Sequence, residues 1–284
     1  MLVNVKAQLE LAKEKNTAVI GFICMDYVMA RTVVYAAEAT NTPAMIMLYP
    51  EHITIQHTTG RKTFAEMVKE LANEVEVPIS VHMDHDFTYE SVMKSIDAGF
   101  GSVMFDGSIK PIEENIALTK KVVEVAHAKG ICVEGEIGHV GSASTSDNKL
   151  EDYFTTVESA VKFCSETGVD SLAISIGNAH GEYVTVPNLD IDRLIAINNA
   201  TETALALHGG SGIPDDQLKI AFSNGINKFN LGTDFLKLYF KAVEEFVEVN
   251  RENKDPVKII DMPEFVQSKL QPYVEDRLRT LCNF

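Results

Sequence analysis

Eight short apolar or β-branched segments recur along the 284-residue chain, and stretches long enough for a helix separate them. Most of these segments are continuously apolar, which is typical of strands that are buried on both faces. The segments begin at Val19, Ala44, Ile79, Ser102, Cys132, Ser171, Leu205 and Lys228. Strands that alternate with helices favour a parallel sheet with right-handed connections. Eight such units predict an α/β fold, a single (β/α)8 barrel of the TIM type.

The stretches between these segments carry helix signals. ARTVVYAAEA has apolar residues at helical spacing, Pro111 and Pro214 stand where helices should begin, and Gly130 stands where one should end. The length suits one barrel of ~250 residues with additions, so we expect one domain over residues 1–284. A helix-rich tail, from about Asp255 to Leu281, should cap the barrel or reach a neighbouring subunit.

The charge of the chain limits its partners. A net charge of −16 and a pI near 4.9 argue against nucleic-acid binding, because a phosphate backbone requires a basic face. The N-terminal segment lacks the features of a signal peptide, and no stretch approaches the ~20 apolar residues of a membrane span. We therefore expect a cytoplasmic protein without membrane contacts. Its four cysteines show no CxxC spacing, which favours buried, reduced thiols.

Three histidines each end one of the apolar segments, in VHMDHD, AISIGNAHG and LALHGGSG. A single histidine at a strand end usually satisfies a local hydrogen bond. A parallel barrel, however, gathers distant strand ends on one face, and a catalytic zinc ion commonly has three protein ligands. The sequence therefore predicts a Zn²⁺ site formed by His85, His180 and His208.

Carboxylates stand beside these histidines. Asp84 directly precedes His85, and consecutive strand residues point to opposite sides, so one should face the metal and the other the substrate. We interpret Asp84 as a general acid/base; the alternative is that it only orients a neighbouring histidine. His82 should be buried in the strand. Three more carboxylates at strand ends could hold a second cation or could simply be solvated: Asp106, Glu134 and Glu136.

Glycine-rich loops follow the sixth and seventh segments, in NAHGEY and HGGSGIPDD. Backbone amides of such loops can approach a phosphate closely, Ser211 adds a hydroxyl, and Pro214 begins a helix whose N-terminus favours an anion. The eighth segment ends in NLGTD, which contributes Asn230, Gly232 and Thr233. We predict a phosphate site between the last two loops, where this fold usually holds one.

These motifs resemble those of the class II, zinc-dependent ketose-bisphosphate aldolases of the fructose- and tagatose-bisphosphate type, over nearly the whole chain. HMDH resembles the family's HLDH, GNAHG resembles GTAHG, HGGSGI is identical to the family motif, and NLGTD fits NxxTD. The resemblance implies proton transfer by Asp84 and a zinc ion held by the three histidines. It further implies a second metal ion at Asp106 and Glu136, and substrate contacts from Gly181, Gly209, Gly210, Ser211, Asn230, Leu231, Gly232 and Thr233.

The implied reaction is the reversible cleavage of a phosphorylated ketose, such as fructose or tagatose 1,6-bisphosphate, to dihydroxyacetone phosphate and an aldehyde such as glyceraldehyde 3-phosphate. We expect a homo-oligomer, a dimer or a tetramer. In the family the C-terminal tail supplies an arginine to a neighbouring subunit's distal phosphate, which suggests Arg277 or Arg279 here. A class I aldolase needs a desolvated lysine, and no lysine ends a segment in a comparably apolar setting.

The chain departs from the family pattern at several positions. GFICMDY replaces the first-strand AFN segment, EYVTVP replaces LYKGxP, and Asp86 replaces a glycine. The loop that usually carries a catalytic glutamate reads GHVGSASTSDNKLED, which leaves three candidates, Asp147, Glu151 and Asp152. The alternatives are an aldolase for another phosphorylated ketose, a non-catalytic regulatory barrel, or a zinc hydrolase, although the last would need an HxH pair on the first strand.

Overall fold

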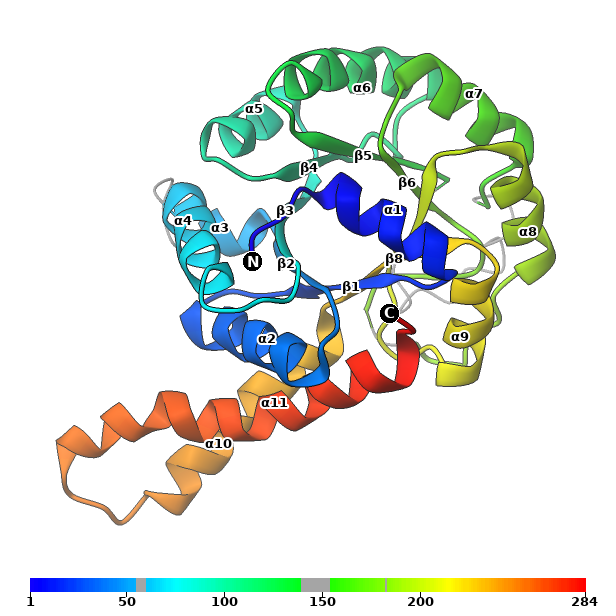
Figure 1. Cartoon of the computed structure of the whole chain (residues 1–284). Helices are drawn as coiled ribbons and strands as arrows, with labels where there is room; N and C mark the ends of the chain where they lie inside the picture. The colour runs from blue at the N-terminus through cyan, green and yellow to red at the C-terminus, as the bar shows by residue number, and fades with distance from the viewer. Residues whose placement is uncertain (55–59, 139–153, 182) are drawn as a thin grey trace.

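The computed structural model describes residues 1–54, 60–138, 154–181 and 183–284. Eight parallel strands form a closed barrel in chain order, with β8 paired back to β1 (Figure 1). This confirms the predicted α/β barrel. The strands are β1 (Val19–Ile23), β2 (Ala44–Leu48), β3 (Ile79–Asp86), β4 (Ser102–Phe105), β5 (Cys132–Ile137), β6 (Ser171–Ile174), β7 (Ala204–Leu207) and β8 (Ile226–Leu231).

Helices cover the outside of the barrel (Figure 1). Every strand residue is buried, which explains why the segments read as continuous apolar runs. Pro111 and Pro214 are the N-caps of α6 and α9, as their positions predicted. The helices are α1 (Val5–Lys15), α2 (Tyr27–Thr40), α3 (Glu51–Thr54), α4 (Gly60–Ala72), α5 (Tyr89–Asp97), α6 (Ile112–His127), α7 (Val157–Thr167), α8 (Ile191–Ala200), α9 (Asp215–Ser223), α10 (Thr233–Val249) and α11 (Met262–Leu281), with the 3-10 helix η2 (Pro256–Asp261) before α11.

Helix α1 lies across the amino-terminal end of the barrel (Figure 1). Its buried Gln8 donates side-chain hydrogen bonds to the carbonyl oxygens of Ala44, at 3.1 Å, and Pro78, at 2.9 Å. These bonds tie α1 to backbone carbonyl groups at the start of β2 and just before β3. The amino-terminal end is therefore closed, and the opposite, carboxyl end remains for a binding site.

The C-terminal helices do not cap the barrel, so that part of the prediction was wrong. Helix α11 packs along the outside against α2 and α10, and α10 and α11 form a hairpin that projects from the barrel (Figure 1). Tyr239 of α10 donates a 2.6 Å hydrogen bond to the N-cap residue of α2, Asp26. The projecting end exposes large apolar side chains, including Phe240, Val249 and Ile260.

The structure also bears on the state of the cysteines and on membrane-spanning helices. Cys24, Cys132, Cys164 and Cys282 are free, and the first three are buried, as predicted. Within the described ranges, no helix combines the length and the apolar character that crossing a membrane requires.

Candidate active site

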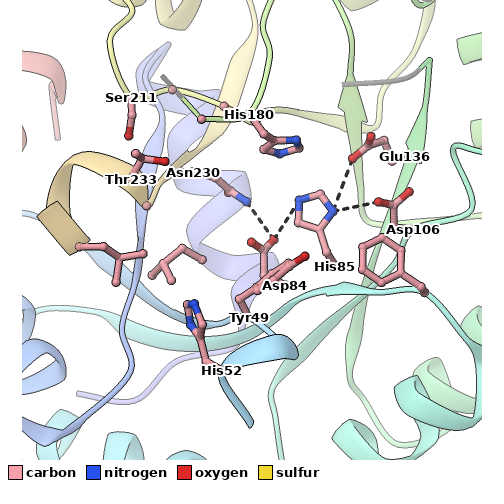
Figure 2. A pocket seen from close by; sticks show the side chains of 17 residues that line it. Tyr49, His52, Asp84, His85, Asp106, Glu136, His180, Ser211, Asn230 and Thr233 are labelled. Carbon is pink, nitrogen blue, oxygen red and sulfur yellow. Dashed lines mark hydrogen bonds and ion pairs between the residues drawn. The ribbon is translucent and has the colours of Figure 1, made fainter. Parts of the chain in front are cut away.

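A pocket of about 360 Å³ opens at the carboxyl ends of the strands (Figure 2). Residues from nearly every loop at this end of the barrel contribute to its wall, which is the usual location of a site in this fold. The lining residues are Ile23, Tyr49, His52, Asp84, His85, Phe87, Asp106, Glu136, His180, Gly181, Gly209, Gly210, Ser211, Asn230, Gly232, Thr233 and Leu236.

A bulge at the end of β3 directs two consecutive side chains into this pocket. Met83 pairs with Val103 and Asp86 pairs with Phe105, so β3 has one residue more than β4 over this interval. His85 lies in the left-handed region, with φ of 36°, a strained conformation that is uncommon outside glycine. The expected divergence of Asp84 and His85 is therefore wrong, because the bulge breaks the alternation and both line the pocket.

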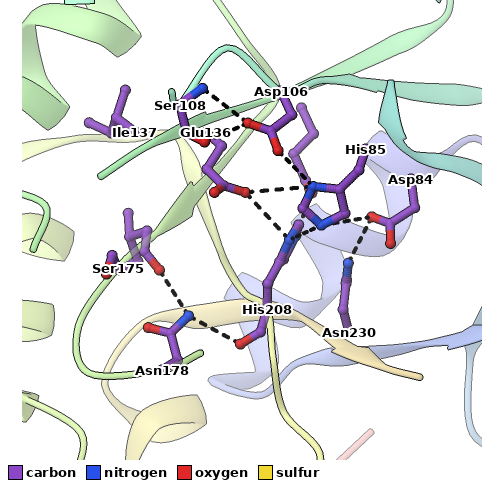
Figure 3. A network of polar contacts seen from close by, with 12 residues as sticks. Asp84, His85, Asp106, Ser108, Glu136, Ile137, Ser175, Asn178, His208 and Asn230 are labelled. Atoms are coloured by element: carbon purple, nitrogen blue, oxygen red, sulfur yellow. Dashed lines mark hydrogen bonds and ion pairs between the residues drawn. The ribbon is translucent and has the colours of Figure 1, made fainter. Parts of the chain in front are cut away.

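The three histidines predicted as ligands converge. His85, His180 and His208 each place a ring nitrogen within 4.8 Å of the others. Nε2 of His85 and Nδ1 of His208 lie only 2.9 Å apart (Figure 3). Two nitrogens that share a tetrahedral zinc ion at ~2.0–2.1 Å are about 3.3 Å apart. The two ring nitrogens would therefore need to move apart by only a few tenths of an ångström to share a cation.

The hydrogen bonds behind the two rings support the same conclusion. Asp106 accepts from Nδ1 of His85 at 3.0 Å, and Glu134 accepts from Nε2 of His208 at 2.9 Å. Each bond favours the tautomer that directs a lone pair toward the other histidine. Two lone pairs at 2.9 Å repel unless a proton or a metal ion lies between them. The donor set thus fits a metal ion of the zinc type.

The electrostatic field at His85 also favours a positive charge. Burial alone would lower its pKa, but Asp84, Asp106 and Glu136 outweigh burial and raise the pKa to about 9. Asp106 is held in turn by the backbone amide of Ser108, at 3.0 Å, and by its hydroxyl, at 2.7 Å. The DGS sequence therefore builds a fixed carboxylate that orients His85.

Asp84 is held by a neighbour from the opposite side of the barrel. Asn230 donates a 3.0 Å hydrogen bond from Nδ2 to Oδ1 of Asp84 (Figure 3). Burial would raise the pKa of Asp84, but His85, His208 and Lys228 outweigh burial and lower it. Asp84 is therefore a charged carboxylate that lines the pocket and can accept a proton.

A buried ion pair beneath the pocket was missed from the sequence. The ammonium of Lys228, on β8, donates to Oε1 of Glu134 at 2.9 Å and to Oδ1 of Asn230 at 2.8 Å. Both Lys228 and Glu134 are fully buried. Glu134 therefore lies inside the barrel and not at its rim, and Lys228, the first residue of the eighth predicted segment, is its buried partner. Its ammonium is paired and it does not line the pocket.

His82, also on β3, is fully buried, as predicted. Its Nδ1 lies 2.8 Å from the hydroxyl of Ser102. Burial lowers its pKa to about 3, which keeps the ring neutral. It has a structural position in the barrel and does not line the pocket.

The glycine loops form the other side of the pocket. Gly181 and Gly209 have φ of 94° and 64°, which glycine adopts at little cost. A Cβ on Gly210 would lie 2.0 Å from the ring of Phe229, so this loop can pack against Phe229 only because Gly210 has no side chain. Ser211 and Thr233 lie near each other (Figure 2), and Thr233 is the first residue of α10. Backbone amides and the positive end of α10 suit an anion here.

Several predicted residues lie elsewhere. The helix that begins after Pro214 carries acidic residues in its first turn and does not line the pocket, so α10 supplies the helix terminus instead. Leu231 belongs to the core. Arg277 pairs with Asp215 and Asp276, and neither Arg277 nor Arg279 lines the pocket of its own chain. The three candidates for the missing glutamate lie outside the described residues, Asp147, Glu151 and Asp152.

Five pocket residues did not stand out in the sequence. They lie in or after β1, β2 and β3 or in α10, and neither periodicity nor spacing predicted their contribution to the pocket. They are Ile23, Tyr49, His52, Phe87 and Leu236.

Comparison with known proteins agrees with this geometry. Residues 3–283 match the family described as fructose-bisphosphate aldolase class-II. A probable fructose-bisphosphate aldolase of Bacillus subtilis is 36% identical over 261 residues, which are 91% of each chain. A 6-phospho-5-dehydro-2-deoxy-D-gluconate aldolase of Shouchella clausii is 38% identical over 225 residues, covering 78% of this chain and 76% of that protein. The crystal structure of the YdjI aldolase from Escherichia coli K12 superposes with a TM-score of 0.86 at 29% identity, covering 99% and 97% of the two chains.

Proposed function

The chain belongs to the class II fructose-bisphosphate aldolase family and is an aldolase, and we propose that it uses Zn²⁺ to cleave a ketose 1-phosphate reversibly. The products are dihydroxyacetone phosphate and an aldehyde. One observation carries the proposal: His85 and His208 direct ring nitrogens at one point, 2.9 Å apart, beside the carboxylate of Asp84. In this arrangement a cation and a proton acceptor can act on the same substrate.

His85, His180 and His208 would hold the metal ion. When bound, Zn²⁺ supplies Lewis-acid polarisation of the ketose carbonyl. Asp84 accepts the proton of the C4 hydroxyl in cleavage and returns it in condensation. Asn230 fixes Oδ1 of Asp84, and Oδ2 is the oxygen we assign to proton transfer.

The phosphate of the dihydroxyacetone phosphate half would bind the amides of Gly181, Gly209 and Gly210, together with Ser211 and Thr233. These residues line one side of the pocket next to the histidines. The hydroxyl of Ser211 already accepts from the amide of Asp234 at 3.1 Å, which ties the loop to the first turn of α10. This end needs no basic side chain, because amides and a helix terminus supply the positive potential.

For Asp106 and Glu136 we propose an orienting role and not a second cation. Asp106 already accepts from His85 and from Ser108. Glu136 lies 3.9 Å from Nδ1 of His85 and 3.7 Å from Nδ1 of His208. Carboxylates behind ligating histidines hold the ring orientation and raise the basicity of the ligand.

The aldehyde half is not fixed by family membership, since one relative is named for fructose bisphosphate and another for 6-phospho-5-dehydro-2-deoxy-D-gluconate. We retain fructose or tagatose 1,6-bisphosphate as the reference substrates for assay. We also propose a cytoplasmic homo-oligomer, a dimer or tetramer, in which the projecting α10–α11 hairpin meets a second copy.

Metal analysis of the purified protein tests the proposal. We expect about one zinc ion per chain, and removal by a chelator should abolish carbon–carbon cleavage until zinc is restored. His180→Ala should lose the ion and the activity, whereas His127→Ala, at a histidine paired with Asp170 outside the pocket, should keep both. Full activity without metal, or borohydride trapping of substrate on a lysine, would overturn the assignment.

A further inference from the structure

The two ends of the pocket differ in chemistry. One end has the glycine loops, two hydroxyls and the terminus of α10. The wall away from them is formed by side chains that follow β2 and β3. Figure 2 shows Tyr49 and His52 on the side of Asp84 opposite to His180 and Ser211. We call this surface the distal wall, and it consists of Tyr49, His52 and Phe87.

The distal wall has no lysine or arginine side chain that could balance the charge of a phosphate. Among the described residues, no lysine or arginine lines the pocket, whereas three carboxylates do, Asp84, Asp106 and Glu136. Arg61 contacts Asp86, beside Phe87, but it is bound to that carboxylate at 3.3 Å and to the carbonyl oxygen of Ser91 at 2.9 Å. A phosphate dianion at this wall would meet repulsion without compensating donors.

The arginines of the C-terminal tail are already paired with carboxylates of their own chain. Arg277 is bound by the carboxylates of Asp215 and Asp276. Arg279 pairs with Glu275 at 2.9 Å. Either guanidinium would have to leave a carboxylate before it could neutralise a second phosphate.

His52 is the polar member of the distal wall. Its Nδ1 is buried and has no hydrogen-bond partner among the described residues. Burial lowers its pKa although Glu51 and Asp84 oppose this, so the ring is neutral near pH 7. A neutral imidazole offers one donor and one acceptor, which suits a hydroxyl group better than an anion.

The aromatic rings beside His52 offer an apolar surface. Tyr49 lies edge-on to His52, with ring centroids 5.5 Å apart, and to His85, at 6.1 Å. Phe87 stacks with His85 at 6.2 Å and is 44% exposed. Ring faces next to the metal ligands can pack against the C–H groups of a carbon chain bound there.

We propose that His52 is a specificity-determining residue that hydrogen-bonds a hydroxyl of an uncharged aldehyde half, and that the substrate carries its only phosphate on the dihydroxyacetone end. The carbon chain of that half packs on Tyr49 and Phe87. This inference rests on the proposed aldolase function and names the class of its second product, a hydroxylated aldehyde without phosphate.

The first test compares two aldehydes in condensation with dihydroxyacetone phosphate by the zinc-loaded enzyme. We expect kcat/KM to be at least about tenfold higher for glyceraldehyde than for glyceraldehyde 3-phosphate, because only the latter places a dianion at the distal wall. An equal or reversed preference overturns the inference.

The second test uses His52→Ala. We expect kcat/KM for glyceraldehyde to fall about tenfold, the scale of one lost hydrogen bond to a neutral group, and His52→Gln to recover part of it. Exchange of the dihydroxyacetone phosphate C–H proton with D2O needs no aldehyde and should change less than about twofold. His127→Ala is the matched control and should leave both rates unchanged.

Exchange of the dihydroxyacetone phosphate proton with solvent separates the hypothesis about His52 from the proposed zinc-dependent aldolase function. If the wild-type protein binds zinc and exchanges the proton, but His52→Ala leaves glyceraldehyde turnover unchanged, the inference about His52 is wrong and the proposed function stands. If the wild-type protein neither binds zinc nor exchanges the proton, the proposed function itself fails.

Discussion

Replacing Lys228 by methionine should damage both the stability of the barrel and the metal site. The substitution keeps most of the side-chain volume and removes the ammonium. Lys228 is fully buried, and its Nζ donates to Glu134 at 2.9 Å and to Asn230 at 2.8 Å. Without it, Glu134 keeps its bonds to His208 and to Ser171, at 2.6 Å, but loses its only full positive charge among the described neighbours.

The expected cost follows from those contacts. Removing one partner of a buried ion pair typically destabilises a protein by ~3–5 kcal/mol. Because His208 and Ser171 still bond Glu134, we expect the lower end of that range, about 3 kcal/mol. His208 should also hold its metal-facing nitrogen less firmly, and loss of such supporting groups typically lowers metal affinity by ~10–100-fold.

The stability lost in Lys228→Met should depend on pH, and the shifted pKa of Glu134 gives the direction. Burial would raise the pKa of Glu134, but Lys228 and His208 outweigh burial and hold it well below its usual range. A depressed carboxyl pKa stabilises the folded state above the unfolded pKa of ~4.3, and this contribution is lost as pH falls through the folded value. The difference between wild type and Lys228→Met should therefore be full at neutral pH and shrink in acid.

Urea denaturation of the metal-free proteins and zinc titration measure the two effects. The double variant Lys228→Met/Glu134→Gln should regain part of the lost stability, because it leaves no unpaired charge. Lys162→Met is the control: Lys162 pairs with Glu113 on the surface, and such pairs contribute ~0–1 kcal/mol. A loss below ~1 kcal/mol for Lys228→Met, with unchanged zinc affinity, would refute this account of the buried pair.

Three more predictions test other parts of the molecule. Asp84→Ala should lower cleavage turnover by ~10²–10⁴-fold while zinc content persists by elemental analysis; equal loss of metal and activity would mark Asp84 as a supporting group only. Gly210→Ala should raise KM for dihydroxyacetone phosphate and lower the melting temperature, because its Cβ would clash with the ring of Phe229. Unchanged values of both would contradict the close packing of Gly210 on Phe229. Phe240→Glu should shift sedimentation toward the monomer if the exposed end of α10 meets a second copy, and an unchanged oligomer would exclude that surface.

The barrel was predictable because each of its strands and helices is encoded by a short, continuous stretch of the sequence. Each strand is a continuous apolar run, and each connection is long enough for a helix, so order and closure follow from general rules of chain topology. The position of the C-terminal helices was not predictable in the same way. Whether α11 caps the barrel or packs on α2 depends on tertiary contacts that an amphipathic pattern does not encode.

The convergence of the three histidines was predictable from the sequence, but the local geometry around them was not. His85 lies near the end of β3, and His180 and His208 follow the ends of β6 and β7, which a parallel barrel brings together. Alternation predicted that Asp84 and His85 would diverge, but the bulge and the positive φ of His85 turn both into the pocket. Bulges arise from the pairing of two strands, so one strand's sequence gives little sign of them.

The buried network explains why the chemistry and the specificity of this pocket are separable. Asp84, Asn230, Lys228, Glu134 and His208 form one chain of hydrogen bonds through the barrel interior, which links the proposed proton acceptor to a proposed metal ligand. A change at Lys228 or Glu134 should disturb both functions, because each of these buried side chains is hydrogen-bonded to a neighbour on either side. The distal wall takes no part in that chain, so its side chains can set the choice of aldehyde without moving the atoms that carry out the reaction.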